Sequence, residues 1–205
     1  MKIALKEYLR QNLNVPNILS SIRMLMIPLY LVLFVRGAKY PALIVFLAAS
    51  LTDLLDGMIA RRYHLITNLG KLLDPLADKL MVLTVMFSMA IGNAAIPPVV
   101  PWLTVGILLG KEFLLMLGGL LMLKRHIVVY SYLIGKVAHC LFIAGLTATF
   151  FHDWLARVCV GWPMTPDLIL LWVAVACTLC ALAFYVVESV HKVLRPTAGD
   201  DQPQA

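Results

Sequence analysis

Charged residues are scarce in this chain of 205 residues: they make up 14% of it, whereas 61% of the residues are hydrophobic. Soluble domains are usually about half apolar and about a quarter charged. The composition therefore excludes an ordinary soluble domain and favours a lipid bilayer, where apolar side chains can face outward as well as inward. Cysteine is also rare, with four residues, and their spacing shows no disulfide framework.

Acidic residues are outnumbered by basic ones, 11 to 17, which gives a net charge of +6. Basic residues of membrane proteins collect on the cytoplasmic side and meet anionic lipid headgroups, so we expect membrane lipids and no nucleic acid as partners. The basic residues on the side that holds both termini are Lys2, Lys6, Arg10, Arg61, Arg62, Lys71, Lys124, Arg125, Lys192 and Arg195, against Arg36, Lys39 and Arg157 on the other. Both termini are therefore predicted to be cytoplasmic.

Apolar residues gather in six segments, each close to the roughly 20 residues that a helix needs to cross a bilayer. The segments are residues 18–36, 40–62, 71–92, 99–122, 130–150 and 167–189. Residues 2–13 are amphipathic, which is typical of a helix lying on the membrane surface. We predict an all-α, polytopic membrane protein with six transmembrane helices and an N-terminal interfacial helix. Residues 1–195 would form one membrane domain and residues 196–205 a disordered tail.

Four aspartates lie inside or at the edge of the second and third segments: Asp53, Asp56, Asp74 and Asp78. A single charge in the middle of a spanning helix costs roughly 2.5–3.5 kcal/mol on insertion scales, so such residues are functional candidates. Their spacings of three and four residues place each pair on one helix face. A short turn between the two helices would bring the two faces opposite each other near the cytoplasmic end.

Clustered carboxylates repel one another unless cations lie between them. Oxygen ligands favour hard ions, so the four aspartates predict a site for two Mg²⁺ or Mn²⁺ ions. The alternative is internal ion pairing with Arg61, Arg62 or Lys79. Three small residues on the same faces leave room for a ligand or for close helix packing, and these are Gly57, Ala60 and Gly70.

One stretch carries a family resemblance: Asp53-Leu-Leu-Asp56-Gly57-Met-Ile-Ala60-Arg61, eight residues, Gly70, three residues, Asp74, three residues, Asp78. It resembles the signature of the CDP-alcohol phosphatidyltransferase family at every fixed position. The flanks are similar to the branch of phosphatidylglycerophosphate synthases and cardiolipin synthases. They are Pro16-Asn17 with Arg23, Leu73 to Lys79, and Ile134-Gly135-Lys136.

Two positions depart from that branch. Bacterial phosphatidylglycerophosphate synthases commonly carry Arg-Glu where this chain has Lys111-Glu112, and lysine keeps the charge but loses the bidentate fork. They also commonly carry Thr at the position of His139, which is the histidine of this chain best placed to line a cavity. Glu112 is a candidate for orienting Lys111.

The resemblance implies transfer of a phosphatidyl group from CDP-diacylglycerol to glycerol 3-phosphate, with release of CMP. It implies that the four aspartates hold two divalent ions against the diphosphate and that Asp78 is the general base. The nucleotide and diphosphate would contact Gly57, Ala60, Arg61, Gly70 and Thr52. Acceptor binding falls to basic residues on three other segments, namely Arg23, Lys111 and Lys136. A homodimer in a bacterial inner membrane, with its active site facing the cytoplasm, is expected.

Three alternatives stay open. Phosphatidylglycerol as acceptor would make the chain a cardiolipin synthase, and an inositol phosphate acceptor is a further option. A different class is a divalent-ion transporter, in which the aspartates bind the transported ion, although no half-to-half repeat supports it. A structural scaffold gives no reason for aspartates within the membrane.

Overall fold

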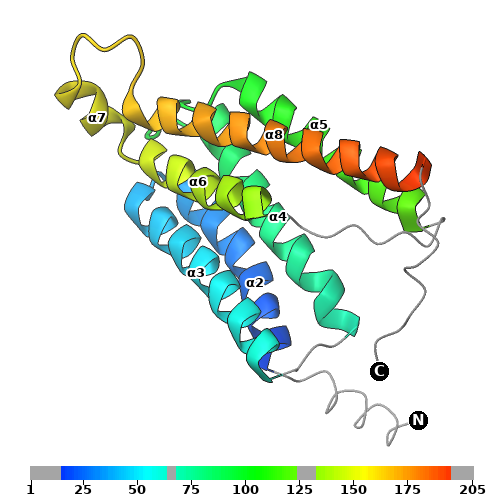
Figure 1. The fold of residues 1–205 in the computed structure, drawn as a ribbon. Helices are drawn as coiled ribbons and strands as arrows, with labels where there is room; N and C mark the ends of the chain where they lie inside the picture. The colour runs from blue at the N-terminus through cyan, green and yellow to red at the C-terminus, as the bar shows by residue number, and fades with distance from the viewer. Residues whose placement is uncertain (1–14, 64–67, 124–132, 195–205) are drawn as a thin grey trace, which may run out of the picture.

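The structure is a computed structural model and describes residues 15–63, 68–123 and 133–194 (Figure 1). Within these ranges the chain forms seven helices and no strand. The helices are α2 Val15–Val35, α3 Lys39–Tyr63, α4 Asn68–Ile91, α5 Trp102–Leu123, α6 Leu133–Thr149, α7 His152–Val158 and α8 Pro166–Leu194. The all-helical prediction is confirmed.

Each of the six long helices coincides with one predicted apolar segment, and the bounds differ by a few residues. The seven-residue helix α7 was not predicted, because it is too short to show a helical period and it follows α6 after a sharp change of direction. The predicted interfacial helix at residues 2–13 and the predicted tail at residues 196–205 lie outside the described residues.

Among the described residues, one helix is long and apolar enough to cross a membrane by itself, Pro166–Glu188, with a mean hydropathy of 2.5. A second qualifies if Ile134–Thr149 and His152–Val158, which meet at 79°, count as one broken span. The arrangement of six transmembrane helices therefore stays a prediction.

The helices form two groups (Figure 1). Helix α2 packs against α3 and α4, and α8 packs against α5 and most extensively against α6. Contacts of α4 with α5 and α6, and fewer contacts of α3 with α6, join the two groups. Helix α4 therefore makes the main connection between the groups.

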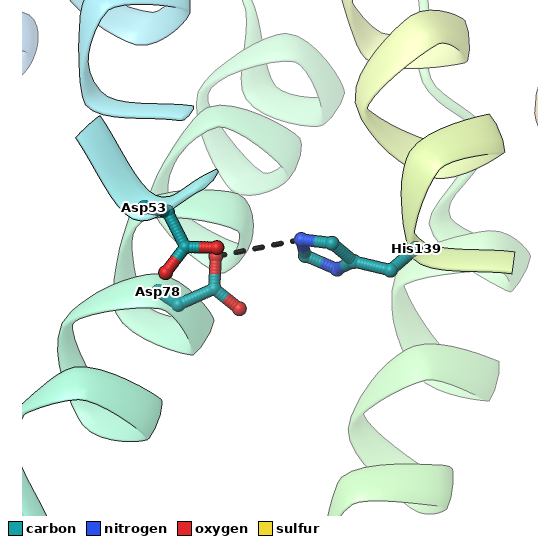
Figure 2. Close-up of side chains that lie close together, drawn as sticks. All are labelled: Asp53, Asp78 and His139. Atoms are coloured by element: carbon teal, nitrogen blue, oxygen red, sulfur yellow. Dashed lines mark ion pairs between the residues drawn. The ribbon is translucent and has the colours of Figure 1, made fainter. Parts of the chain in front are cut away.

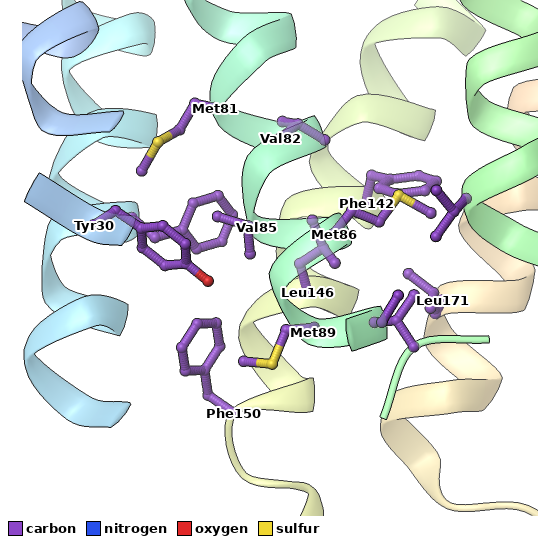
Figure 3. Close-up of a cluster of buried hydrophobic side chains, with 14 of the residues drawn as sticks. Tyr30, Met81, Val82, Val85, Met86, Met89, Phe142, Leu146, Phe150 and Leu171 are labelled. Atoms are coloured by element: carbon purple, nitrogen blue, oxygen red, sulfur yellow. The ribbon is translucent and has the colours of Figure 1, made fainter. Parts of the chain in front are cut away.

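The core lies along α4, as Figure 3 shows. Met81, Val85 and Met89 recur every four residues, Met86 lies three residues before Met89, and each of the four is at most 2% exposed. This spacing turns one face of α4 into the bundle. From the two groups, the apolar residues that meet this face are Tyr30, Phe34, Phe46, Phe142, Leu146, Phe150 and Leu171.

Glycine and asparagine fix the ends of α2 and α4. Gly37 has a φ of 74°. Its N–H donates to the Phe34 carbonyl, and the Ala38 N–H donates to the Leu33 carbonyl, which is the Schellman ending of a helix. Asn93, just after α4, donates from Nδ2 to the Phe34 carbonyl at 2.5 Å. The ends of α2 and α4 are thereby tied together.

Polar contacts hold α7 at the end of the bundle. Lys39 Nζ donates to Asp153 Oδ2 at 2.7 Å, and His152 Nδ1 lies 2.8 Å from Oδ2 of the fully buried Asp167 at the start of α8. The hydrogen bond from Lys39 holds the pKa of the Asp153 carboxyl below its usual range. The contact is therefore present at neutral pH and is lost in acid, as the pH falls through that lowered pKa.

Candidate active site

Two of the four predicted metal-binding aspartates are described with their side chains, and they lie together. Asp53 on α3 and Asp78 on α4 present their carboxylates to the same small space, and His139 on α6 points into it from the other group of helices (Figure 2). One oxygen of each carboxylate and one ring nitrogen of His139 all lie within 4.8 Å of one another. The spacing predicts that α3 and α4 turn their aspartates toward each other, and Asp53 and Asp78 have this arrangement.

The other members of the predicted signature lie on the same two helices. Asp56, Gly57, Ala60 and Arg61 belong to α3, and Gly70 and Asp74 belong to α4. Their side chains lie outside the described part of the chain, so their roles stay predictions.

Arg23, predicted to bind the acceptor, lies at the carboxylates. Its side chain is 1% exposed, and Nη1 is 2.9 Å from Oδ1 of Asp53. A buried guanidinium beside a carboxylate offsets charge that would otherwise repel within the cluster. The structure therefore places Arg23 against a predicted metal ligand.

Thr52, predicted at the nucleotide, uses its hydroxyl locally. Its Oγ1 donates to the Ala49 carbonyl at 2.7 Å, within α3. The hydroxyl oxygen keeps acceptor capacity, but its proton is already used by the helix backbone.

His139 contributes the least expected contact of the site. Its Nε2 lies 3.5 Å from Oδ1 of Asp78. This nitrogen is buried and has no hydrogen-bond partner among the described residues. The sequence signals were its place inside an apolar segment and its departure from the Thr common in similar proteins.

A three-residue ion cluster joins α4 to α5. Lys79 Nζ lies 2.6 Å from Oε2 of Glu112, and Lys111 Nζ lies 2.5 Å from Oε1 of the same carboxylate. The predicted contact between Glu112 and Lys111 is therefore present. Among the residues that the structure describes with side chains, Lys79 pairs with Glu112. Ion pairing of Asp56 and Asp74 lies outside that part of the chain. With both lysines charged and Glu112 ionised, the cluster carries a net positive charge.

A cavity of about 370 Å³ lies between α4, α5, α6 and α8. The charged residues and the histidine among its lining are Asp78, Lys79, Lys111, Glu112 and His139. Apolar residues form most of the remaining lining, including Val82, Leu108, Leu115, Phe142 and Leu182. Such a cavity can hold a molecule that is part anionic and part apolar.

Lys136, the third predicted acceptor-binding residue, is exposed and is not among the residues that line this cavity. Its neighbour Gly135 does line it. Sequence reasoning missed Lys79 as a cavity residue, although its place directly after Asp78 on an apolar helix was a usable signal.

Comparison with known proteins gives three kinds of match. A family model described as CDP-alcohol phosphatidyltransferase matches residues 13–189. The chain is 34% identical over 125 residues to a CDP-diacylglycerol--glycerol-3-phosphate 3-phosphatidyltransferase of Aquifex aeolicus, covering 60% of this chain and 68% of the relative. A Bacillus subtilis protein with the same name is 29% identical over 177 residues, or 79% of this chain and 88% of the relative. A CMP-forming cardiolipin synthase of Streptomyces coelicolor is 38% identical over 120 residues, or 56% and 53%.

Proposed function

The chain belongs to the CDP-alcohol phosphatidyltransferase family, and from this premise we propose that it transfers a phosphatidyl group from CDP-diacylglycerol to glycerol 3-phosphate. The observation that carries the proposal is the meeting of Asp53 and Asp78 beside a cavity that also holds two lysines. The acceptor hydroxyl would form a bond to the lipid-side phosphorus, the bond from that phosphorus to the CMP oxygen would break, and CMP would leave with the electron pair.

Two divalent ions, Mg²⁺ or Mn²⁺, are part of the proposal, with Asp53, Asp56, Asp74 and Asp78 as their ligands. The described residues fit such ions, because carboxylates from two helices converge there and a buried ring nitrogen beside them has no hydrogen-bond partner among the described residues. When bound, the ions supply charge neutralisation of the diphosphate and of the departing phosphate.

Asp78 is the proposed general base. Its side chain lies on the cavity wall, so it can reach the hydroxyl of an acceptor held there. It would take the hydroxyl proton as the new phosphorus–oxygen bond forms. Arg23, whose Nη1 lies 2.9 Å from Oδ1 of Asp53, would hold the Asp53 carboxylate in position.

The acceptor phosphate is proposed to bind at Lys79 and Lys111. Their ammonium groups flank one carboxylate on the cavity wall, and the surplus positive charge suits a small dianion. Arg23 and Lys136 stay in the predicted acceptor set. The position of Arg23 against Asp53, and the exposure of Lys136, make Lys111 the leading member. The nucleotide is proposed to contact Gly57, Ala60, Arg61, Gly70 and Thr52.

The outer surface supports a protein with six transmembrane helices. Large apolar side chains point outward on several helices, for example Leu25 at 70%, Val35 at 74%, Ile44 at 66% and Val187 at 67% exposed. Soluble monomers rarely expose contiguous apolar surface on this scale, whereas lipid tails cover it. We propose a multi-pass protein of a bacterial inner membrane, active at the cytoplasmic face and assembled as a homodimer.

The second candidate is a cardiolipin synthase, with phosphatidylglycerol as acceptor. Two observations favour it: the Streptomyces coelicolor relative carries that name, and most of the cavity lining is apolar. Family membership weighs against the interpretation as an ion transporter.

An acceptor panel tests the proposal. Purified protein in detergent receives labelled CDP-diacylglycerol, Mg²⁺ or Mn²⁺, and either glycerol 3-phosphate, phosphatidylglycerol or inositol phosphate, and CMP release is measured. We expect CMP with glycerol 3-phosphate and little with the others. Product from phosphatidylglycerol alone would replace the first function by the second, and no CMP with any acceptor would reject both.

A further inference from the structure

The proposed mechanism leaves His139 without a task, although it lies at the centre of the site. Of the three residues whose donor atoms gather there, His139 is the one that comes from α6, in the other group of helices from Asp53 and Asp78. The aspartate signature on α3 and α4 does not include His139.

The position of its Nε2 atom suits a metal ligand. The atom is buried and lacks a hydrogen-bond partner among the described residues, and it lies 3.5 Å from Oδ1 of Asp78. Bonds of about 2.1 Å to one ion place neighbouring ligand atoms about 3.0–3.4 Å apart. The observed separation is close to that range, as expected for two ligands that would close slightly around an ion.

Asp53 can join the same ion. Arg23 approaches Oδ1 of Asp53, and a carboxylate has a second oxygen that can bind a metal at the same time. One oxygen of each carboxylate and one ring nitrogen of His139 lie within 4.8 Å of one another, only slightly wider than the span of about 4.2 Å between opposite ligands of one ion.

A nitrogen donor changes which ion the site prefers. Mg²⁺ takes oxygen ligands almost exclusively, whereas imidazole suits transition metals. Mn²⁺ accepts carboxylate and water oxygens and stands between the two classes. A site with two carboxylates and one imidazole should therefore bind Mn²⁺ better than Mg²⁺.

We propose that His139 is a nitrogen ligand, beside Asp53 and Asp78, of one divalent ion, and that it shifts the preference of this site from Mg²⁺ toward Mn²⁺. The inference rests on the metal dependence that is part of the proposed function. It adds a ligand from α6 to the four aspartates and thereby links the two groups of helices through the ion.

Electron spin echo spectroscopy of bound Mn²⁺ tests it directly. The full chain in detergent is loaded with substoichiometric Mn²⁺, and modulation from a directly bonded ¹⁴N nucleus is sought. We expect this modulation in the unmodified protein, its loss in His139→Thr, and its persistence in His191→Thr, which removes an exposed histidine of α8. We also expect His139→Thr to weaken Mn²⁺ binding by about tenfold or more while Mg²⁺ binding changes little.

The outcomes are separable. Absence of ¹⁴N modulation in the unmodified protein, or its persistence in His139→Thr, overturns the proposal and leaves only the contact of His139 with Asp78. If His139→Thr does not fold, His139→Gln, of similar size but without a ring nitrogen, replaces it. CMP release with glycerol 3-phosphate is measured on every sample. Activity without nitrogen modulation rejects only the His139 ligand, whereas no CMP with any acceptor rejects the proposed function.

Discussion

At the scale of single residues, each described carboxylate of the site has its own cationic or imidazole neighbour. Asp53 lies beside Arg23, and Asp78 lies beside His139. Two carboxylates in a poorly solvated space raise each other's energy, and nearby positive charge offsets this cost. The site can therefore keep its shape when no ion is bound. An ion would then bind to a preformed site, and the helices would not have to fold around it.

The first prediction concerns Asp78. Asp78→Asn keeps the size of the side chain but removes both the proposed base and a metal ligand, so CMP release should fall by at least ~10²-fold. The folded fraction, measured by size exclusion and thermal unfolding in detergent, should change little. Asp153→Asn is the matched control, because Asp153 lies on α7 and is paired there with Lys39 of α3. Near-normal activity of Asp78→Asn would remove Asp78 from the mechanism.

A second prediction separates charge from shape at Lys111. A charge-assisted hydrogen bond contributes about 1.5–3 kcal/mol, so Lys111→Met should raise the KM for glycerol 3-phosphate about 10- to 100-fold. The KM for CDP-diacylglycerol should change much less. Lys111→Arg retains the charge and adds a bidentate fork, so it should keep a KM close to the original. Equal losses in Lys111→Met and Lys111→Arg would point to packing and not to phosphate binding.

At the scale of elements, apolar runs predicted all six long helices, because a segment of that length and composition has few other folds available. Pairings across helices were harder to predict. Which residue Lys79 meets depends on the face that α4 turns toward α5, and that face is set by the packing of Met86 and its neighbours. The same reason explains why the sequence indicates an acceptor role for Arg23, whereas the structure pairs Arg23 with Asp53.

The third prediction tests a close backbone approach between α6 and α8. At Gly145 on α6, an added Cβ would lie 3.2 Å from the Leu171 Cα on α8, whereas at Gly110 on α5 nothing lies within 4 Å. Gly145→Leu should therefore force α6 and α8 apart and destabilise the protein by about 1–3 kcal/mol. Gly110→Leu should be neutral or stabilising, because leucine is the better helix former. Thermal unfolding in detergent compares the two, and equal midpoints would show that the α6–α8 contact is not limiting.

At the scale of the whole molecule, the site lies where the two groups of helices meet. Asp53 and Asp78 come from one group, and His139 and Lys111 come from the other. The aspartates could be predicted from the sequence because they break an apolar pattern within two adjacent helices. The contribution of α5 and α6 could not, because it depends on how the second group docks along α4.

The last prediction follows from that position. Chelation with EDTA should abolish CMP release, and either Mg²⁺ or Mn²⁺ should restore it. Ions that bind only the folded state should also raise its stability, by about 2.7 kcal/mol at an ion concentration of 100 times Kd. The shift in unfolding midpoint should be lost in Asp53→Asn combined with Asp78→Asn. It should be retained in Asp153→Asn, since that carboxylate lies on α7 away from the cavity. Turnover that survives EDTA would refute the metal site. Restored turnover without a rise in midpoint would instead show that the ions bind together with the diphosphate and not to the protein alone, because Mg²⁺ is usually shared with substrate phosphates.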